Sequence, residues 1–452
     1  ILAQAVSPLF GFAQAALPAA TLPFWGSPHA LGRMTLTLLC LAQSCWCFAA
    51  CPLLAAALQV FFRRFVITRS VQKHVEWFAR FQRMEPLASL PFTPTVTCEP
   101  LESPLMDRFD WVMMPESPWL GRGGCDYVTE ATPWLDRRRV RDPQTVWAAP
   151  HAVHRLLEAA SEHFDPGRAD RVVLFSGTEY PLSAAFGLTK AERDETVAQL
   201  RRYFRRIVVQ TKDVAALEHV HLAPMGLSFG YLLLVQDHWI DSRKGRWVAM
   251  LRGMAEFRAT LDGVTLQGKT LNLLAAWGAI AGWLDMPATS IDRIPYLEAA
   301  GEYMPFSNSS LLAVEAAHQS RRQLRAWALT PAARAAGVSR KNIKPFAWWS
   351  ELARYRFLLS PSGSGIQTAK NIEALLVMTI PIVKQPQGFE TFNELVDLGF
   401  PIVLVRRWTE VSLNATAAWW ATLSPRLESF RRNCLTVDGF WRMYVGEVSR
   451  CA

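Results

Sequence analysis

One stretch, residues 354–383, constrains the fold of this chain more than any other. It contains a short apolar run, residues 357–359, with the length and composition of a buried strand. Residues 360–365 are rich in glycine and serine and cannot continue that strand, because proline lacks a backbone donor and glycine favours tight turns. From residue 368 apolar side chains recur at helical spacing, and residues 379–383 are apolar and largely β-branched. The predicted order of strand, loop, helix and strand is typical of a parallel crossover.

The loop of this crossover is suited to binding an anion. Residues 362–365 are small and expose backbone N–H groups at a helix N-terminus, where the helix dipole favours a group such as a diphosphate. Lys370 adds positive charge in the first turn. Glu373 lies one turn further on, where a carboxylate can accept hydrogen bonds from both hydroxyls of a ribose. A buried crossover with a polar loop and a solvated glutamate would produce the same pattern.

The same loop is not a Walker A motif. That motif requires a glycine directly before the lysine and a serine or threonine directly after it. Here Lys370 follows Ala369 and precedes Asn371. The sequence therefore disfavours P-loop kinase or ATPase chemistry.

The length and charge of the chain limit its partners. Its 452 residues can form two domains and a membrane anchor. The net charge of +9 suits anionic partners such as nucleotide phosphates, acidic polysaccharide or anionic lipid. Nucleic acid is not expected as a partner, because no dense basic stripe is interleaved with aromatic residues.

A membrane anchor is predicted near the start of the chain. Residues 34–62 contain no charged side chain and exceed the roughly 20 residues that span a bilayer. Residues 1–33 are interpreted as a hydrophobic leader that need not be ordered, and residues 63–95 as a juxtamembrane stem. A long helix buried in a soluble core is the alternative for residues 34–62.

The orientation in the membrane is left open by two opposed signals. Basic residues at 63–73 outnumber those before the anchor, which would keep the C-terminal part in the cytosol. The glycosylation sequons at Asn308 and Asn414 favour the lumen instead. Four cysteines lie outside the anchor, and both lumenal disulfides and reduced buried thiols are compatible with them. They are Cys98, Cys125, Cys434 and Cys451.

Strand-like and helix-like segments alternate through most of the remaining chain. This pattern predicts an α/β fold with parallel sheets, divided into domains at 96–262 and 263–410 and followed by a helical tail at 411–452. In the first domain we expect strands at 171–175, 207–209 and 219–222, and helices at 145–164 and 190–204. In the second we expect strands at 271–276 and 401–405 in addition to the crossover.

Ligands of parallel sheets bind at the carboxyl ends of the strands. Residues 176–179 and 210–213 follow two predicted strands of the first domain and should therefore lie near a cleft. Glu179, Asp213 and His221 are the candidate general bases there. Each also has a structural interpretation: Glu179 as a turn cap, Asp213 as a helix cap and His221 as a structural histidine.

Residues 354–408 resemble the C-terminal half of exostosin-type glycosyltransferases. In that family a strand ends in a Pro-x-Gly-type loop, and a basic residue follows three positions before a glutamate, then Ala-Leu and Ile-Pro-Val. Here those features are Pro361, Gly363, Lys370, Glu373, Ala374-Leu375 and Ile380-Pro381-Ile382. The family usually has Arg at the position of Lys370 and Gly at that of Met378. The resemblance weakens toward residue 170 and does not cover the first 95 residues.

The resemblance implies a GT-B fold, in which two Rossmann-like domains face each other across a cleft. It also implies an inverting transfer from a UDP- or GDP-linked sugar to a glycan or glycoprotein, by a single-pass Golgi membrane protein with a lumenal catalytic domain. The absence of an Asp-x-Asp motif agrees with a metal-independent reaction, and no resident cofactor or metal is expected. The alternatives are a non-catalytic membrane-anchored scaffold with the same fold and a soluble nucleotide-binding enzyme of another reaction type.

The resemblance and the pattern together predict a nucleotide-sugar site in the second domain. The loop and Lys370 should contact the diphosphate, and Glu373 the ribose, with further basic residues nearby. The predicted site residues are Arg340, Lys341, Arg356, Ser362, Gly363, Ser364, Gly365, Thr368, Lys370 and Glu373. The base should come from the first domain, from Glu179, Asp213 or His221.

Overall fold

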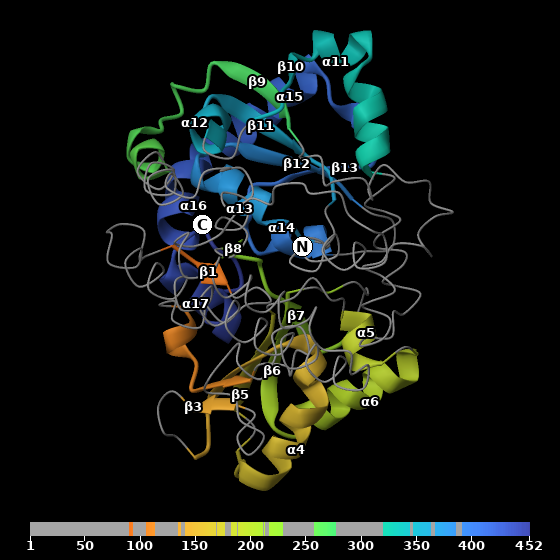
Figure 1. Ribbon diagram of the computed structural model, residues 1–452, viewed down its shortest axis with the longest axis vertical. Helices are drawn as coiled ribbons and strands as arrows, with labels where there is room; N and C mark the ends of the chain where they lie inside the picture. Colours follow the sequence, from red (N-terminus) through yellow and green to blue (C-terminus); the bar gives the residue numbers. More distant parts are fainter. Residues whose placement is uncertain are drawn as a thin grey trace, which may run out of the picture. The chain divides into compact units, whose positions relative to one another are not determined.

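The computed structural model describes fourteen ranges of the chain. They are residues 90–93, 105–113, 134–136, 141–168, 170–176, 182–187, 189–210, 212, 217–228, 257–276, 320–343, 347–362, 367–385 and 391–452. Within these ranges the protein is a mixed α/β structure with two largely parallel sheets (Figure 1). The predicted α/β class is therefore confirmed.

The first sheet has the strand order β3-β2-β4-β5-β6-β7, and all neighbours are parallel except β2 and β3. Its strands are β2 (Trp111–Met113), β3 (Trp134–Asp136), β4 (Thr145–Ala148), β5 (Arg171–Phe175), β6 (Phe204–Val209) and β7 (Val220–Leu222). The helices of this region are η4 (Met106–Arg108), η5 (Pro150–Ala152), α4 (Val153–His163), α5 (Leu182–Phe186) and α6 (Lys190–Arg201).

The second sheet has the strand order β10-β9-β11-β12-β13 and is parallel throughout. Its strands are β9 (Leu271–Ala275), β10 (Val338–Arg340), β11 (Tyr355–Ser360), β12 (Ile380–Lys384) and β13 (Val403–Val405). Its helices are α11 (Pro331–Ala335), α12 (Trp348–Leu352), α13 (Ala369–Leu376), α14 (Thr391–Asp397) and η9 (Trp408–Glu410).

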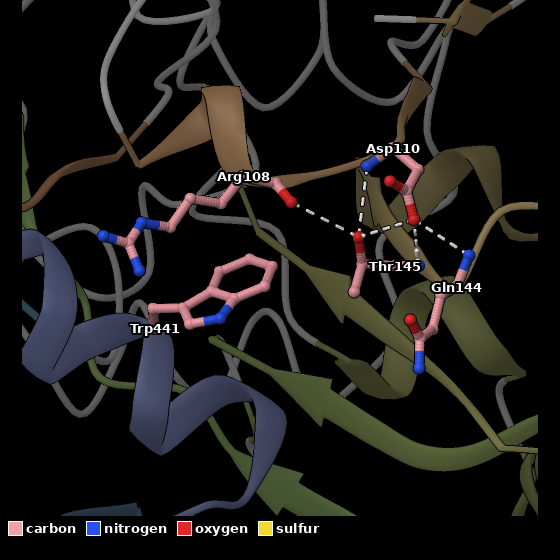
Figure 2. Close-up of a pocket in the computed structure, with 5 residues that line it drawn as sticks. All are labelled: Arg108, Asp110, Gln144, Thr145 and Trp441. Atoms are coloured by element: carbon pink, nitrogen blue, oxygen red, sulfur yellow. Dashed lines mark hydrogen bonds between the residues drawn. The ribbon is translucent and has the colours of Figure 1, made fainter. Parts of the chain in front are cut away.

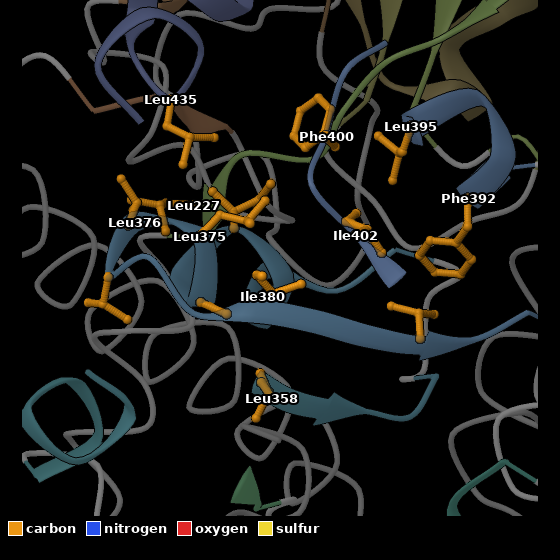
Figure 3. Packing of buried hydrophobic residues seen from close by; sticks show 14 of the residues in the cluster. Leu227, Leu358, Leu375, Leu376, Ile380, Phe392, Leu395, Phe400, Ile402 and Leu435 are labelled. Atoms are coloured by element: carbon orange, nitrogen blue, oxygen red, sulfur yellow. The ribbon is translucent and has the colours of Figure 1, made fainter. Parts of the chain in front are cut away.

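The predicted crossover is present as β11, α13 and β12. Thr368 caps the N-terminus of α13, and its side chain accepts a hydrogen bond from the backbone N–H of Lys370. Leu375 and Leu376 of α13 pack in the same buried cluster as Ile380 of β12 (Figure 3). Met378 then turns the chain into β12 with a φ of 55°, in the left-handed region that glycine adopts most easily. Glycine would adopt this conformation without strain, whereas Met378 occupies it with a buried side chain.

Two boundaries in the first domain were predicted wrongly. Residues 145–164 are not one helix: Thr145–Ala148 forms β4, and α4 starts only at Val153. The helix predicted at 190–204 ends at Arg201, and Phe204 is the first residue of β6. In both places an apolar strand lies so close to the helix that its residues extend the apolar pattern of the helix. The short edge strand β10 was not predicted.

Helices cover one face of the first sheet, and the tail covers the other. Residues of α4 and α6 share a buried cluster with Val146, Val173 and Ile207. Trp147, Leu174 and Val208, whose side chains alternate with these, belong to the cluster that includes the last helix. The tail comprises α15 (Leu413–Leu423), η10 (Ser424–Arg426), α16 (Leu427–Cys434) and α17 (Val437–Val445).

Helix α17 is hydrogen-bonded to the first sheet, although it follows the second sheet in the chain. The Arg206 side chain of β6 donates to the carbonyl oxygens of Tyr444 and Met443, at 2.9 and 3.2 Å. The Tyr444 hydroxyl donates to the Pro224 carbonyl at 3.0 Å. The end of the tail is fixed by a disulfide between Cys434 and Cys451.

The predicted leader and anchor lie outside the described residues. Among the residues that are described, no helix is both long enough and apolar enough to cross a membrane. At the end of the predicted stem, β1 (Phe92–Thr93) pairs in parallel with β8 (Leu227–Ser228), and Leu90 is buried. The last stem residues are therefore part of the fold.

Candidate functional site

The N-terminal turns of α13 place a lysine and a glutamate beside a tryptophan. Trp348, the first residue of α12, donates its indole N–H to the Glu373 carboxylate at 2.7 Å. The Lys370 ammonium lies 5.4 Å from the centroid of the same indole ring, within cation–π range. Glu373 is only 4% exposed. The carboxylate is therefore held in one orientation by a neighbour that sequence analysis had not assigned to the site.

Burial sets the protonation tendencies of this pair. Desolvation raises the pKa of Glu373, and the Lys370 charge and the Trp348 hydrogen bond oppose that rise. Desolvation likewise lowers the pKa of Lys370, while Glu373 opposes the change. Arg321 adds a second positive charge near Lys370. Lys370 is thus suited to an anionic group, and Glu373 to hydroxyl donors.

Two further polar groups beside this turn are buried without partners. The Ser362 hydroxyl, which follows β11, and the Asn371 side-chain oxygen, in the first turn of α13, accept and donate no hydrogen bond among the described residues. Ser362 and Asn371 are 5% and 3% exposed. The Arg321 side chain, from the helical segment 320–328, donates to the Ser362 carbonyl at 3.0 Å. Buried polar groups normally have partners, so these positions indicate a place where a polar ligand completes the bonding.

The other predicted basic residues lie on β11 and at the end of β10. Arg356 is exposed near the start of β11, about 13 Å along the strand from Ser360, and its guanidinium lies 5.4 Å from the Trp420 ring centroid. Arg340 is exposed at the end of the edge strand β10. Lys341 is paired with Glu351, which raises the pKa of the lysine. The structure therefore groups Thr368, Lys370 and Glu373 with Ser362, and it does not bring Arg356 to them.

Several predicted residues lie outside the described ranges. They are Gly363, Ser364, Gly365, Glu179, Asp213 and Asn308. The described base candidate is His221, an exposed residue of β7. Partial desolvation and the charges of Arg206 and Lys212 lower its pKa to about 4. The imidazole is therefore neutral at pH 7, but a pKa so far below the working pH makes it a weak general base.

The carboxyl ends of strands from both sheets are joined by Gln367, directly before the cap of α13. Its side-chain amide donates to the carbonyl oxygens of Gln210, after β6, and Ala223, after β7, at 2.5 and 2.8 Å. Its side-chain oxygen accepts from the Met225 N–H at 2.8 Å. No sequence signal could have identified this role, because all three partners are backbone groups distant in the chain.

A second contact joins the same strand ends. Lys212, which is 5% exposed, forms an ion pair with Glu394 of α14 at 2.6 Å. The Thr391 hydroxyl donates to the Lys212 carbonyl. Lys212, which follows β6, is thus held by two side chains of α14, the helix after β12.

The sequon at Asn414 lies in the first turn of α15. Asn414 itself is exposed, but Thr416 is 1% exposed and its hydroxyl donates to Leu413 and accepts from the Asn272 amide. Glycosylation at this position would have to precede folding of α15.

Within the described ranges, no group of three or more His, Cys, Asp or Glu side chains is arranged to hold a metal ion. Comparison of the chain with protein-family models gives no match, and comparison with curated proteins gives none at a significant level.

Proposed function

We propose that this protein is a glycosyltransferase that moves a sugar from a UDP- or GDP-linked donor to a glycan or glycoprotein acceptor. The observation that carries the proposal is the buried Glu373 carboxylate, oriented by Trp348 beside Lys370 at the N-terminus of α13. The exostosin-type resemblance of residues 354–408 supports the same assignment.

The donor would occupy the N-terminal end of α13. Backbone N–H groups, Lys370 and the Ser362 hydroxyl would bind the diphosphate, and the helix dipole would add to this attraction. Glu373 would accept hydrogen bonds from the ribose hydroxyls. The unpartnered atoms of Ser362 and Asn371 would gain partners from the ligand.

A GT-B arrangement with an inverting, metal-independent reaction follows from this assignment. The acceptor hydroxyl attacks the anomeric carbon, the bond from that carbon to the diphosphate oxygen breaks, and a base takes the hydroxyl proton. Cations and N–H groups at α13 stabilise the departing diphosphate. The contacts of Gln367 with Gln210 and Ala223 support the arrangement, because they join the carboxyl ends of both sheets. The base remains one of Glu179, Asp213 and His221.

The proposed location is the Golgi membrane, with residues 34–62 as a single span and the catalytic domain in the lumen. The disulfide between Cys434 and Cys451 supports the lumenal side, because disulfides persist in oxidising compartments and are rare in the cytosol.

Thermal unfolding with nucleotides tests the proposal. UDP, GDP and their sugars at about 100 times Kd should add about 2.7 kcal/mol of stability and raise Tm. Glu373→Gln should abolish the shift while the protein stays folded. Glu351→Gln is the matched control, since it removes a paired and partly buried carboxylate of α12. If no nucleotide diphosphate or nucleotide sugar raises the Tm of the wild-type protein at millimolar concentration, the proposal is wrong.

A second candidate is a membrane-anchored binding protein that has kept the fold without catalysis. The lysine at position 370 favours it, because an ammonium lacks the two-pronged contact that arginine makes with a phosphate. Measuring sugar transfer and donor hydrolysis with the protein that binds nucleotide separates the two candidates.

A further inference from the structure

A polar cavity lies beside the first sheet. It has a volume of about 360 Å³ and is lined by Arg108, Asp110, Gln144, Thr145 and Trp441 (Figure 2). Asp110 directly precedes β2, and Thr145 begins β4, so the cavity is at the amino ends of these parallel strands. The groups proposed for the nucleotide lie instead at the carboxyl end of β11. The cavity is therefore a separate site.

The floor of the cavity is a hydrogen-bond network around Asp110 and Thr145. One Asp110 carboxylate oxygen accepts from the backbone N–H groups of Gln144 and Thr145, both at 2.9 Å, and from the Thr145 hydroxyl at 3.1 Å. The Asp110 N–H donates back to the Thr145 hydroxyl at 3.1 Å. Asp110 and Thr145 are 7% and 9% exposed. The floor is thus fixed before any ligand arrives, which lowers the entropic cost of binding.

The walls are an aromatic ring and an amide. Trp441 of α17 is partly exposed, and the Phe109 ring packs against it at 74° with centroids 5.1 Å apart. The Arg108 guanidinium lies 5.8 Å from the Trp441 ring centroid and is paired with Asp438. Gln144 is exposed on the other side of the cavity from Trp441 (Figure 2). Its side-chain amide makes no hydrogen bond among the residues that the structure describes.

The charged groups of the cavity already have partners. Arg108 is paired with Asp438, and the Asp110 carboxylate accepts from backbone N–H groups. With two carboxylates beside one guanidinium, the cavity is not expected to attract an anion. It offers an aromatic ring, an amide that both donates and accepts, and a hydroxyl. A sugar ring matches this set, because its C–H face packs on an aromatic ring while its hydroxyl groups bond to amides.

We propose that this cavity binds a neutral oligosaccharide, with one sugar ring packed on Trp441 and its hydroxyl groups bonded to Gln144. The choice of a glycan rests on the proposed glycosyltransferase function. Since the cavity is at the amino ends of the strands, the bound sugar is not the one that reacts. The site holds a distant part of a long acceptor.

Binding of defined sugars to the purified full chain tests the site. Cellohexaose, xylohexaose and mannohexaose serve as probes, measured by isothermal titration calorimetry. At least one should bind, and Trp441→Ala and Gln144→Ala should each weaken it about tenfold. Trp441→Tyr should keep most of the affinity, since it retains an aromatic face. Trp420→Ala is the matched control, a partly buried tryptophan of α15 that should leave binding unchanged.

The proposal is wrong if no hexasaccharide binds at about 10 mM, or if wild type and both alanine variants bind it with equal affinity. It is also wrong if a nucleotide binds more tightly than any sugar and Gln144→Ala weakens that nucleotide binding. If Trp441→Ala does not fold, the affinities of Gln144→Ala and Trp441→Tyr for the hexasaccharides still test the proposal. Nucleotide-induced thermal shifts are measured separately on the same samples. Sugar binding without nucleotide shifts contradicts the proposed donor site alone, and the reverse contradicts this cavity alone.

Discussion

At the scale of single residues, the candidate site depends on how Glu373 is held. A buried carboxylate is costly unless it is bonded and near a positive charge, and Glu373 has one indole donor and one nearby ammonium. Trp348 is therefore as important to the site as the charged pair. Glu373 is therefore not a solvated glutamate, and its fixed carboxylate would meet the predicted ribose from one direction.

Removing the indole N–H should weaken both stability and nucleotide binding. Trp348→Phe keeps the ring under Lys370 but deprives Glu373 of its 2.7 Å donor. We expect a loss of about 1.5–3 kcal/mol in the free energy of unfolding, typical of a lost hydrogen bond to a charged group. Urea denaturation with and without UDP measures both effects. Trp420→Phe is the control, and equal behaviour of the two variants would show that the indole N–H has no role.

At the scale of elements, α13 is supported at its end as well as at its start. Lys269 is 2% exposed, and its side-chain nitrogen donates to the Val377 carbonyl and, at 2.7 Å, to the Thr379 hydroxyl. The Thr379 hydroxyl also lies within hydrogen-bonding distance of the carbonyl oxygens of Leu352 and Tyr355. This network connects the end of α13 to the strands on both sides of it. None of these partners of Lys269 and Thr379 is a carboxylate.

The buried lysine should make stability depend on pH. Desolvation and the Arg431 charge lower its pKa from 10.5 to about 6. Between these values the unfolded chain holds a proton that the folded protein lacks, so stability should rise with pH by up to about 1.4 kcal/mol per unit. Urea denaturation at pH 7 and 9 measures the slope. Lys269→Met should flatten it, whereas exposed Lys190→Met should not; an unchanged slope in Lys269→Met would refute the assignment.

Elements were predictable where local pattern and topology agree. The crossover at 354–383 has an apolar strand, a breaking loop and an amphipathic helix, so its order could be predicted from the sequence alone. The β4 strand was missed because its apolar residues extend the apolar pattern of the helix that follows, although Pro150 between them marks a new start. The edge strand β10 has only three residues, and its pairing with β9 depends on a segment more than 60 residues earlier.

At the scale of the whole molecule, contacts between distant segments decide the arrangement, and these were not predictable. Gln367 is a single amide in a glycine-rich loop, and its partners lie 142 to 157 residues away. Tyr444 meets Pro224 across 220 residues. Because both contacts use backbone carbonyl groups, no pairing of side-chain types in the sequence indicates them.

Loss of the Gln367 amide should affect both sheets at once. Gln367→Leu keeps the side-chain volume but leaves the Gln210 and Ala223 carbonyl groups and the Met225 N–H unpaired in a buried place. Each unsatisfied group costs about 1–3 kcal/mol, so we expect a total of several kcal/mol, less what water recovers. Hydrogen exchange should then speed up at the ends of β6 and β7 and at the start of α13 together. Gln199→Leu, at a partly exposed position of α6, should change stability by less than about 0.5 kcal/mol. If exchange in Gln367→Leu increases only near α13, the amide does not couple the two sheets, and the contact between their strand ends depends on Lys212 and Glu394 instead.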